Sequence, residues 1–237
     1  MKPVIAMDDV WKRYQMGKAG GLTVLKEIDL TINKGDFVAI TGPSGSGKST
    51  MMNLVGALDI PSHGAIYLDD KDIGSISESS LALLRGKKIG FIFQQFNLIP
   101  TLSALQNVML PMELIDTPEH KAKERATELL TMLGLGDRMH HKPTELSGGQ
   151  QQRVAIARSL SNDPDIILAD EPTGNLDSKT GTFVMDFLGK MHKQGKTIVL
   201  VTHDLNLVHY AKRIVYIMDG RIEKDIENGK SRGGKRR

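Results

Sequence analysis

Residues 42–49 read Gly42-Pro43-Ser44-Gly45-Ser46-Gly47-Lys48-Ser49, which is the complete pattern of a phosphate-binding loop. An apolar segment, 37–40, precedes the loop, and a helix-like run follows it from Thr50. Glycines let the backbone curl until successive N–H groups converge on one anion, and the helix N-terminus adds its positive dipole. Lys48 would reach the β- and γ-phosphates, and the Ser49 hydroxyl would bind Mg²⁺. An ordinary strand-to-helix turn rarely carries the whole pattern, so the loop predicts binding of a nucleoside triphosphate.

Length and charge limit the class of protein. A chain of 237 residues can form one large domain or a core with an inserted subdomain. The formal net charge is only +3, so no general affinity for polyanions follows, and the absence of cysteine excludes disulfides and thiolate metal sites. Acidic residues at positions 8 and 9 argue against a signal peptide, and no apolar stretch has the length of a membrane span. Any work at a membrane would therefore be that of a peripheral subunit.

The distribution of apolar residues predicts an α/β fold with a mainly parallel sheet, because short, continuous apolar strands alternate with helices. Residues 4–41 are expected to form an N-terminal antiparallel β region, and later strands are expected at 66–68, 89–93, 166–169, 197–201 and 214–217. Helices are expected at about 104–114, 118–133 and 148–160. The predicted organisation is a core of 1–94 and 161–222, a helical insertion of about 95–160, and a basic tail, 223–237. We expect the tail to be solvated and flexible, with attraction to anionic lipid or a partner as the alternative.

A second chemical segment is Ile166-Ile167-Leu168-Ala169-Asp170-Glu171. It puts two carboxylates at the C-terminal end of an apolar strand, where open α/β sheets bind ligands. In a chain with a phosphate loop, Asp170 would hold the Mg²⁺ shell and Glu171 would polarise the attacking water. Such a pair alone is a weak signal because loop acids are common. Following a phosphate loop, it predicts a chain that hydrolyses its nucleotide.

A third segment is Leu146-Ser147-Gly148-Gly149-Gln150-Gln151-Gln152-Arg153, followed by a helix-like run. A serine, two glycines and a free helix N-terminus would form a second anion site. Two γ-phosphate sites on one chain are redundant for a monomeric enzyme. The pair is better explained by a composite site that two copies share.

Ser147-Gly148-Gly149-Gln150, between a phosphate loop and a strand that ends in Asp-Glu, resembles the ATP-binding-cassette (ABC) ATPases over about residues 4–222. The resemblance implies a P-loop NTPase core, ATP and Mg²⁺ as ligands, and a homodimer that forms on ATP. Catalytic roles are implied for Glu171, His203 and Gln94, and metal contacts for Ser49, Gln94 and Asp170. Nucleotide contacts are implied for Tyr14, Gly42, Ser44, Gly45, Ser46, Gly47, Lys48, Ser49, Thr50, Ser147, Gly148, Gly149, Gln150 and Asp177.

The resemblance also gives individual roles to residues that carry no signal alone. Tyr14 would stack on adenine, although it could be an ordinary strand aromatic. Gln94 would reach the metal and the attacking water, Asp177 would communicate between the paired sites, and His203 would bond the γ-phosphate. The neighbouring pair His140-His141 has no partner at metal-ligand spacing and is interpreted as a surface pair.

Two stretches, 93–104 and 171–177, resemble the LolD/MacB-type branch of the family. That resemblance implies a separate transmembrane permease subunit, driven from the cytoplasmic face of the membrane. The alternative is a soluble ABC ATPase that acts on nucleic acid or chromosomes. The family resemblance implies that such members carry a very long coiled-coil or zinc-bearing insertion between the phosphate loop and the Ser-Gly-Gly-Gln segment. Here only about a hundred residues separate Lys48 from Ser147, without sustained heptads or cysteines, so no nucleic-acid partner is expected.

The membrane contact is expected within residues 94–111. Four apolar residues there, Phe96, Leu98, Ile99 and Leu102, are expected to be exposed and to surround Gln94, which is expected to touch the nucleotide. Such an arrangement would pass the state of the nucleotide to a docked partner. The alternative is that these side chains pack the core of the helical subdomain, and we expect this for two of the four.

Overall fold

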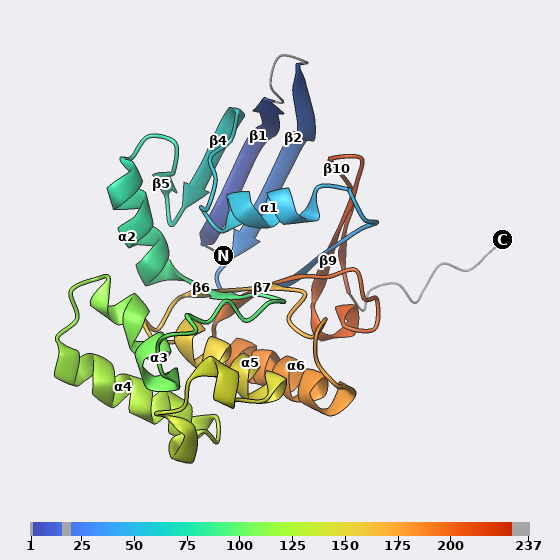
Figure 1. The fold of residues 1–237 in the computed structure, drawn as a ribbon. Coiled ribbons are helices and arrows are strands. Elements are labelled where there is room, and N and C mark those ends of the chain that lie inside the picture. Colours follow the sequence, from blue (N-terminus) through green and yellow to red (C-terminus); the bar gives the residue numbers. More distant parts are fainter. Residues whose placement is uncertain (1, 16–19, 229–237) are drawn as a thin grey trace. The chain divides into compact units, whose positions relative to one another are not determined.

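The computed structural model describes residues 2–15 and 20–228. They form two compact units, labelled by element in Figure 1 and described separately. Unit 1 comprises Met1–Leu81 with Gly189–Arg237, and unit 2 comprises Ala82–Leu188. The predicted helical insertion of about 95–160 lies in unit 2, but unit 2 also includes residues 82–94 and 161–188, which the sequence assigned to the core. In the described ranges, no helix is both long and apolar enough to cross a membrane.

Unit 1 contains the expected antiparallel sheet. Its strands lie in the order β2 (Gly21–Asn33), β1 (Pro3–Gln15), β4 (His63–Leu68) and β5 (Lys71–Asp72) (Figure 1). In β2, Ile28 and every second residue after it up to position 32 are buried, while the residues between them are exposed. This alternation is the pattern of a strand with one face on a core.

Unit 1 also contains the parallel strands that carry the phosphate loop. All of β3 (Phe37–Thr41) is buried, and it pairs in parallel with β8 (Thr197–Val201) and β9 (Arg213–Met218). The helix α1 (Lys48–Val55) follows β3 and packs against β2. A strand without exposed residues is what a sheet covered on both faces requires, so the apolar run predicted this position correctly.

The end of the chain differs from the prediction. β10 (Arg221–Glu227) forms an antiparallel hairpin with β9, and the Arg213 Nε donates to the Asp225 carboxylate at 2.7 Å. The prediction of a flexible tail from residue 223 is therefore wrong for 223–227, because ladder hydrogen bonds and this ion pair tie them to β9. Residues 229–237, which hold the basic run, lie outside the described residues.

Unit 2 combines a strand pair with three packed helices. β6 (Ile89–Ile92) pairs in parallel with β7 (Ile166–Asp170). The helices α3 (Ala104–Glu113), α4 (Glu119–Met132) and α5 (Gly148–Ser159) pack against one another. The sequence predicted each of the three to within one residue at each end, because their apolar residues recur at helical spacing.

The two remaining helices, α2 (Glu78–Lys88) and α6 (Ser178–Lys193), had no predicted bounds. α2 was not predicted, because Leu81 is its one buried residue and so it has no apolar stripe. α6 occupies the helical interval expected before β8. Three short 3₁₀ turns complete the described elements: η2 (Gly136–Arg138), η3 (Pro143–Glu145) and η4 (Val208–Tyr210).

Candidate active site

The phosphate loop turns sharply between β3 and α1. Gly42, Gly45 and Gly47 have φ angles of 153°, 78° and 105°, which L side chains rarely adopt. At Gly42 a Cβ atom would lie 2.1 Å from the carbonyl oxygen of Ile217, so a larger residue would displace backbone. The glycines of the motif therefore permit a turn that other residues would block. Three predicted loop residues are exposed: Ser44, Gly45 and Ser49.

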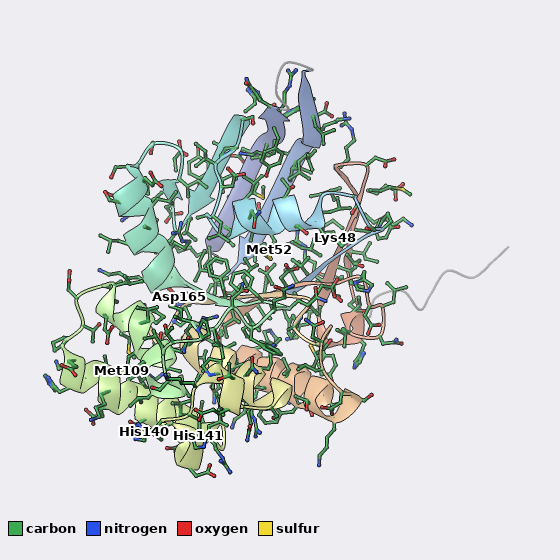
Figure 2. The ribbon with its side chains drawn as sticks, viewed as in Figure 1. Lys48, Met52, Met109, His140, His141 and Asp165 are labelled. Carbon is green, nitrogen blue, oxygen red and sulfur yellow. The ribbon has the colours of Figure 1, made fainter. Side chains whose placement is uncertain are left out.

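The N-terminus of α1, together with the phosphate loop, is positively charged and has no side-chain cap. Lys48 begins α1 (Figure 2), and its ammonium donates to the carbonyl oxygens of Gly42 at 2.9 Å and Pro43 at 2.8 Å. The N-cap residue Gly47 offers no side chain to the first N–H groups of the helix. The hydroxyl of Ser46 is buried and has no hydrogen-bond partner among the described residues. An ammonium, an uncapped helix end and an unsatisfied buried hydroxyl fit a phosphate anion.

His203 follows the strand next to the phosphate loop. β8 pairs with β3 in register Ile40↔Val201, and the Thr202 N–H donates to the Ile40 carbonyl oxygen at 3.1 Å. Both strands run in the same direction, so the phosphate loop and His203 leave the sheet at the same carboxyl edge. The sequence predicted the two segments separately, and unit 1 brings them to one edge.

Tyr14 lies near the end of β1 with 37% of its surface exposed. Its hydroxyl donates to Asp59 Oδ2 at 3.0 Å. Burial raises the pKa of the Tyr14 phenol, the Asp59 hydrogen bond raises it further, and a hydrogen bond with Thr50 opposes the rise. Two predicted nucleotide residues, Tyr14 and Thr50, are therefore neighbours. Asp59 was not predicted, because a single aspartate after a helix carries no pattern.

In unit 2, as in unit 1, the predicted site residues follow the ends of two adjacent parallel strands. β6 and β7 pair in register Ile92↔Ala169, so Gln94 follows one strand at the edge where the other delivers Asp170 and Glu171. Glu171 has a φ of 43°, which is uncommon for a residue with a side chain and recurs at functional sites. The predicted metal and catalytic residues of this unit thus leave two adjacent parallel strands together.

The backbone after Glu171 turns back onto Gln94. The Gly174 N–H donates to the Glu171 carbonyl oxygen at 3.0 Å, and Asn175 Nδ2 donates to the Gln94 carbonyl oxygen at 3.1 Å. A Cβ atom on Gly174 would lie 2.7 Å from the Gln94 amide nitrogen. Only a glycine admits this approach without displacing the side chain of Gln94. The contact joins the predicted sensor to the segment that leads to Asp177.

Ser147 caps α5, which corrects one expectation. The sequence predicted a free helix N-terminus, but the Ser147 hydroxyl accepts from the Gln150 N–H and the Gln150 side chain accepts from the Ser147 N–H. This capping box satisfies two donors at that helix end. Gly148 is exposed, and a Cβ atom there would meet the ring of Phe96 at 3.8 Å.

The start of α6 lies against the glycine turn of α5. A Cβ atom on Gly149 would lie 3.1 Å from the side chain of Thr180. Asp177 accepts from the Thr180 N–H at 3.0 Å and from its hydroxyl at 2.7 Å, and these bonds, the backbone one first, lower the pKa of Asp177. The predicted communication residue therefore lies one side chain away from the predicted second anion site.

Gln152 is a further residue of this region that the sequence analysis did not select. It is fully buried in α5, and its Nε2 donates to the Pro172 carbonyl oxygen at 2.8 Å. Its Oε1 is buried and accepts no hydrogen bond from the part of the chain that the structure describes. The bond ties α5 to the residue after Glu171. A run of glutamines in sequence does not show which one turns inward.

The predicted metal ligands suit a Mg²⁺ ion that is bound together with the nucleotide, and not a metal ion that is held by protein side chains alone. Among the described residues, no group of three or more His, Cys, Asp or Glu could hold a metal ion. Mg²⁺ prefers hard oxygen ligands and is usually held by one or two protein groups together with substrate phosphates. The Ser49 hydroxyl and Asp170 carboxylate are donors of this kind. His140 and His141 lie together in unit 2 (Figure 2), and Arg138 contacts His141 at 3.1 Å.

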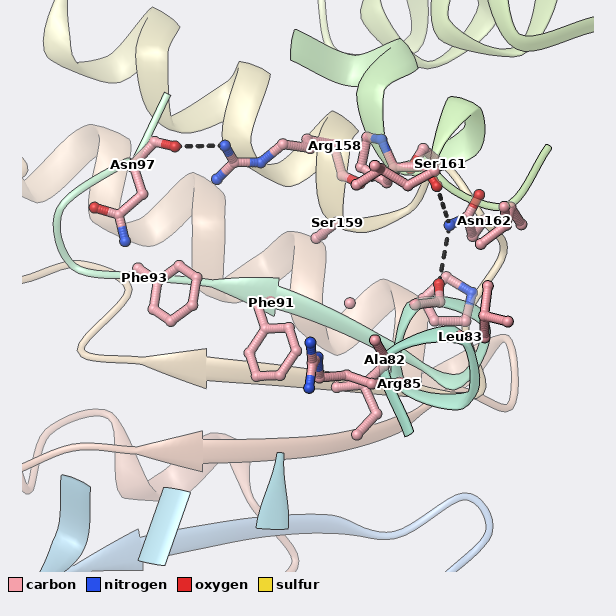
Figure 3. A pocket seen from close by; sticks show the side chains of 17 residues that line it. Ala82, Leu83, Arg85, Phe91, Phe93, Asn97, Arg158, Ser159, Ser161 and Asn162 are labelled. Carbon is pink, nitrogen blue, oxygen red and sulfur yellow. Dashed lines mark hydrogen bonds between the residues drawn. The ribbon is translucent and has the colours of Figure 1, made fainter. Parts of the chain in front are cut away.

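Unit 2 also contains an apolar cavity of about 470 Å³ (Figure 3). Phe91, Phe93, Leu114 and Ile115 line it, with Arg158 among them. The Arg158 guanidinium donates to the carbonyl oxygens of residues 97 at 2.5 Å and 96 at 2.8 Å, and burial lowers its pKa. Within the described part of the chain, it bonds no carboxylate.

Comparison with known proteins gives consistent matches. Residues 25–174 match the family model described as "ABC transporter". An uncharacterized ABC transporter ATP-binding protein of Thermotoga maritima is 50% identical over 223 residues, which cover 94% of this chain and 95% of that protein. The macrolide export ATP-binding/permease protein MacB of Bdellovibrio bacteriovorus is 51% identical over 94% of this chain, which spans only 34% of MacB.

Two solved structures of MJ0796 from Methanocaldococcus jannaschii also match. One is described as a dimeric ABC transporter cassette, with 48% identity and a TM-score of 0.87, covering 94% of this chain and 98% of that one. The other is described as a dimeric post-hydrolysis state bound to ADP and Pi, with 47% identity, a TM-score of 0.86 and the same coverage of each chain.

Proposed function

The chain belongs to the ATP-binding proteins of ABC transporters, and we propose that two copies bind ATP together and drive a separate membrane permease. It is an ATPase of the LolD/MacB-type branch, with ATP as substrate and Mg²⁺ as cofactor. The alternative, action on nucleic acid, has no support among the relatives. The chain works as a peripheral subunit on the cytoplasmic face of the membrane.

The strand ends support the chemical roles. Lys48 and His203 leave adjacent parallel strands of unit 1 and bind the γ-phosphate. Gln94 and Glu171 leave adjacent parallel strands of unit 2, where Glu171 accepts the proton of the attacking water. Ser49 and Asp170 would hold Mg²⁺, which would neutralise charge on the phosphate oxygens. Tyr14 stacks its exposed ring on adenine.

Two substitutions test these roles. Glu171→Gln keeps the shape of the side chain but removes the base, so ATP binding should persist while hydrolysis falls at least about a hundredfold. Lys48→Ala removes a positive charge from the phosphate loop and should weaken ATP binding itself. The measurements are equilibrium binding and single-turnover hydrolysis on the same preparations. Near-normal turnover by Glu171→Gln would show that another group accepts the proton.

The capped end of α5 is the part that meets the nucleotide of the second copy. Ser147 and Gly149 lie at this end, and Thr180 connects Gly149 to Asp177. A γ-phosphate that contacts Ser147 of one copy would therefore influence Asp177 in the same copy. The dimeric structures of MJ0796 support an assembly of this kind.

The apolar cavity of unit 2 is the docking site for the permease. Among the four apolar residues expected to be exposed, only Ile99 is, at 38%, while Phe96, Leu98 and Leu102 are partly buried. The cavity next to them offers aromatic walls and a desolvated guanidinium, Arg158, whose hydrogen bonds within residues 2–15 and 20–228 go to carbonyl oxygens. A short permease helix that carries apolar residues and one carboxylate matches both features.

Because the chain lacks cysteine, an introduced thiol is its sole reactive thiol. We would place single cysteines at Leu83 and Leu114, which line the cavity, and at Met132, a control on α4 outside it. Leu83 is 46% exposed and Met132 is 51% exposed, so their intrinsic reactivity should match. Crosslinks to the co-purified membrane protein should form from Leu83→Cys and Leu114→Cys but not from Met132→Cys. Equal crosslinking from all three, or no crosslink from either Leu83→Cys or Leu114→Cys, would reject the docking site.

A further inference from the structure

Three polar side chains of unit 1, Lys12, Tyr14 and Asp59, form a hydrogen-bonded cluster. Lys12 and Tyr14 are two residues apart on β1, so they project from the same face of the strand. Asp59 follows α1. Its Oδ1 accepts a hydrogen bond from the Lys12 ammonium at 2.6 Å, and its Oδ2 accepts one from the Tyr14 hydroxyl at 3.0 Å. One carboxylate therefore connects the aromatic strand to the helix that begins with the phosphate loop.

The cluster is a built feature rather than a chance surface contact. Lys12 is only 8% exposed, and besides Asp59 its ammonium donates to the Ile60 carbonyl oxygen at 2.8 Å. Asp59 Oδ1 also accepts from the Ile60 N–H at 2.8 Å. Burial tends to raise the pKa of Asp59, but the hydrogen bonds from Lys12, Ile60 and Tyr14 outweigh it and lower the pKa. Asp59 is thus an anion at neutral pH, and the Tyr14 hydroxyl is the donor in their bond.

The same contacts restrict the ring. The hydroxyl is held at one end by Asp59, and the Lys12 ammonium lies 5.0 Å from the centre of the ring, within the range of a cation–π contact. A tyrosine side chain has two rotatable angles, and these contacts hold both. The ring nonetheless keeps 37% of its surface exposed. It is an ordered aromatic surface without an aromatic neighbour in the described chain.

We propose that Asp59 is a positioning residue that orders the Tyr14 ring for the adenine of ATP before the nucleotide arrives. This inference rests on the proposed stacking role of Tyr14. Without Asp59, the ring would have to be ordered at the moment of binding. Ordering one such side chain corresponds to about twofold to twelvefold in Kd. Asp59 should affect only the part of the affinity that comes from the base, because it does not contact the phosphate loop in the described chain.

The test compares ATP with inorganic tripolyphosphate, which lacks the base, by calorimetric titration of the full chain with Mg²⁺. Asp59→Asn should weaken ATP binding about twofold to twelvefold and leave tripolyphosphate binding unchanged. Tyr14→Phe keeps the ring, loses the bonds of its hydroxyl to Asp59 and Thr50, and leaves no buried charge unpaired, so it should behave the same way even if Asp59→Asn folds poorly. Asp70→Asn, which changes an exposed partner of Lys2, is the matched control and should alter neither affinity.

A double substitution shows whether Asp59 acts through the ring. In a Tyr14→Ala background, Asp59→Asn should cause no further loss of ATP affinity. The inference is wrong if Asp59→Asn and Tyr14→Phe bind ATP like the wild type, or if both ligands weaken together. If Tyr14→Ala itself binds ATP normally, the stacking role of Tyr14 fails, and the inference fails with it. Loss in Tyr14→Ala with no loss in the other two rejects only the positioning role of Asp59.

Discussion

Asn107 gives a sharp test of how the segment after Gln94 is held. It is fully buried in α3, and its Oδ1 accepts from the Ile99 N–H at 2.8 Å. Its Nδ2 lies within 3.1 Å of the carbonyl oxygens of Ile99 and Leu102 and 3.0 Å of that of Ser103. We predict that Asn107→Ala releases this loop locally while α3 stays folded.

The size of the effect follows from the number of bonds. An amide NH₂ has two hydrogens, so three acceptors share two donors, and the side chain makes about three bonds' worth of interaction. At about 1 kcal/mol for each bond, the loss is about 3 kcal/mol, with more if the Ile99 N–H stays buried and unpaired. That free energy corresponds to roughly a hundredfold change in the population of the open loop.

Amide hydrogen exchange measures this loss where it occurs, which matters because a chain with two compact units need not unfold in one step. The Ile99 amide should exchange roughly a hundredfold faster in Asn107→Ala. Gln106→Ala is the control on the same helix, because it removes only the exposed bond to the Ser103 N–H and should cost about 0.5–1 kcal/mol. Unchanged protection of Ile99 in Asn107→Ala would refute the reasoning and show that other contacts hold the loop.

Three further predictions concern the nucleotide site and its support. Ser147→Arg combined with Glu171→Gln should bind ATP with near-normal affinity but remain monomeric in size exclusion with ATP, whereas Glu171→Gln alone should dimerise; loss of ATP binding would mean that Ser147 serves its own chain. Gly42→Ala should abolish ATP binding in titration, because its Cβ would lie 2.1 Å from the Ile217 carbonyl oxygen, and normal affinity would contradict the loop geometry. The pKa of Asp59 is lowered in the folded chain, so ionised Asp59 stabilises the fold at pH values above its ordinary pKa of 3.8. This stabilisation is lost as the pH falls through the lowered pKa. The stability difference between wild type and Asp59→Asn should therefore be constant from pH 8 to about 5 and vanish in strong acid, as followed by urea unfolding.

Several features were predictable because they depend on neighbours in sequence. The phosphate loop needs only a strand, glycines and a helix start, and the structure has all three around Lys48. Likewise, the apolar strand that ends at Asp170 and the helices of unit 2 are confirmed, because periodic apolar residues specify elements locally. The P-loop NTPase fold is confirmed by the likeness to the MJ0796 cassettes. The roles of the individual site residues stay predictions.

Other features depended on the tertiary structure, and the physical reason is the distance in sequence between partners. Asp59 bonds Tyr14 across 45 residues, and Gln152 bonds the Pro172 carbonyl oxygen across 20. A single aspartate or glutamine has the same local pattern whether it faces water or a partner. From the sequence alone we could therefore predict which residues would carry the phosphate chemistry, and we could locate most strands and helices, though not α2. The tertiary structure was needed to show which polar groups are buried away from water. It therefore identified Asp59 as the residue that bonds Tyr14, and Gln152 as the residue that bonds the segment after Glu171.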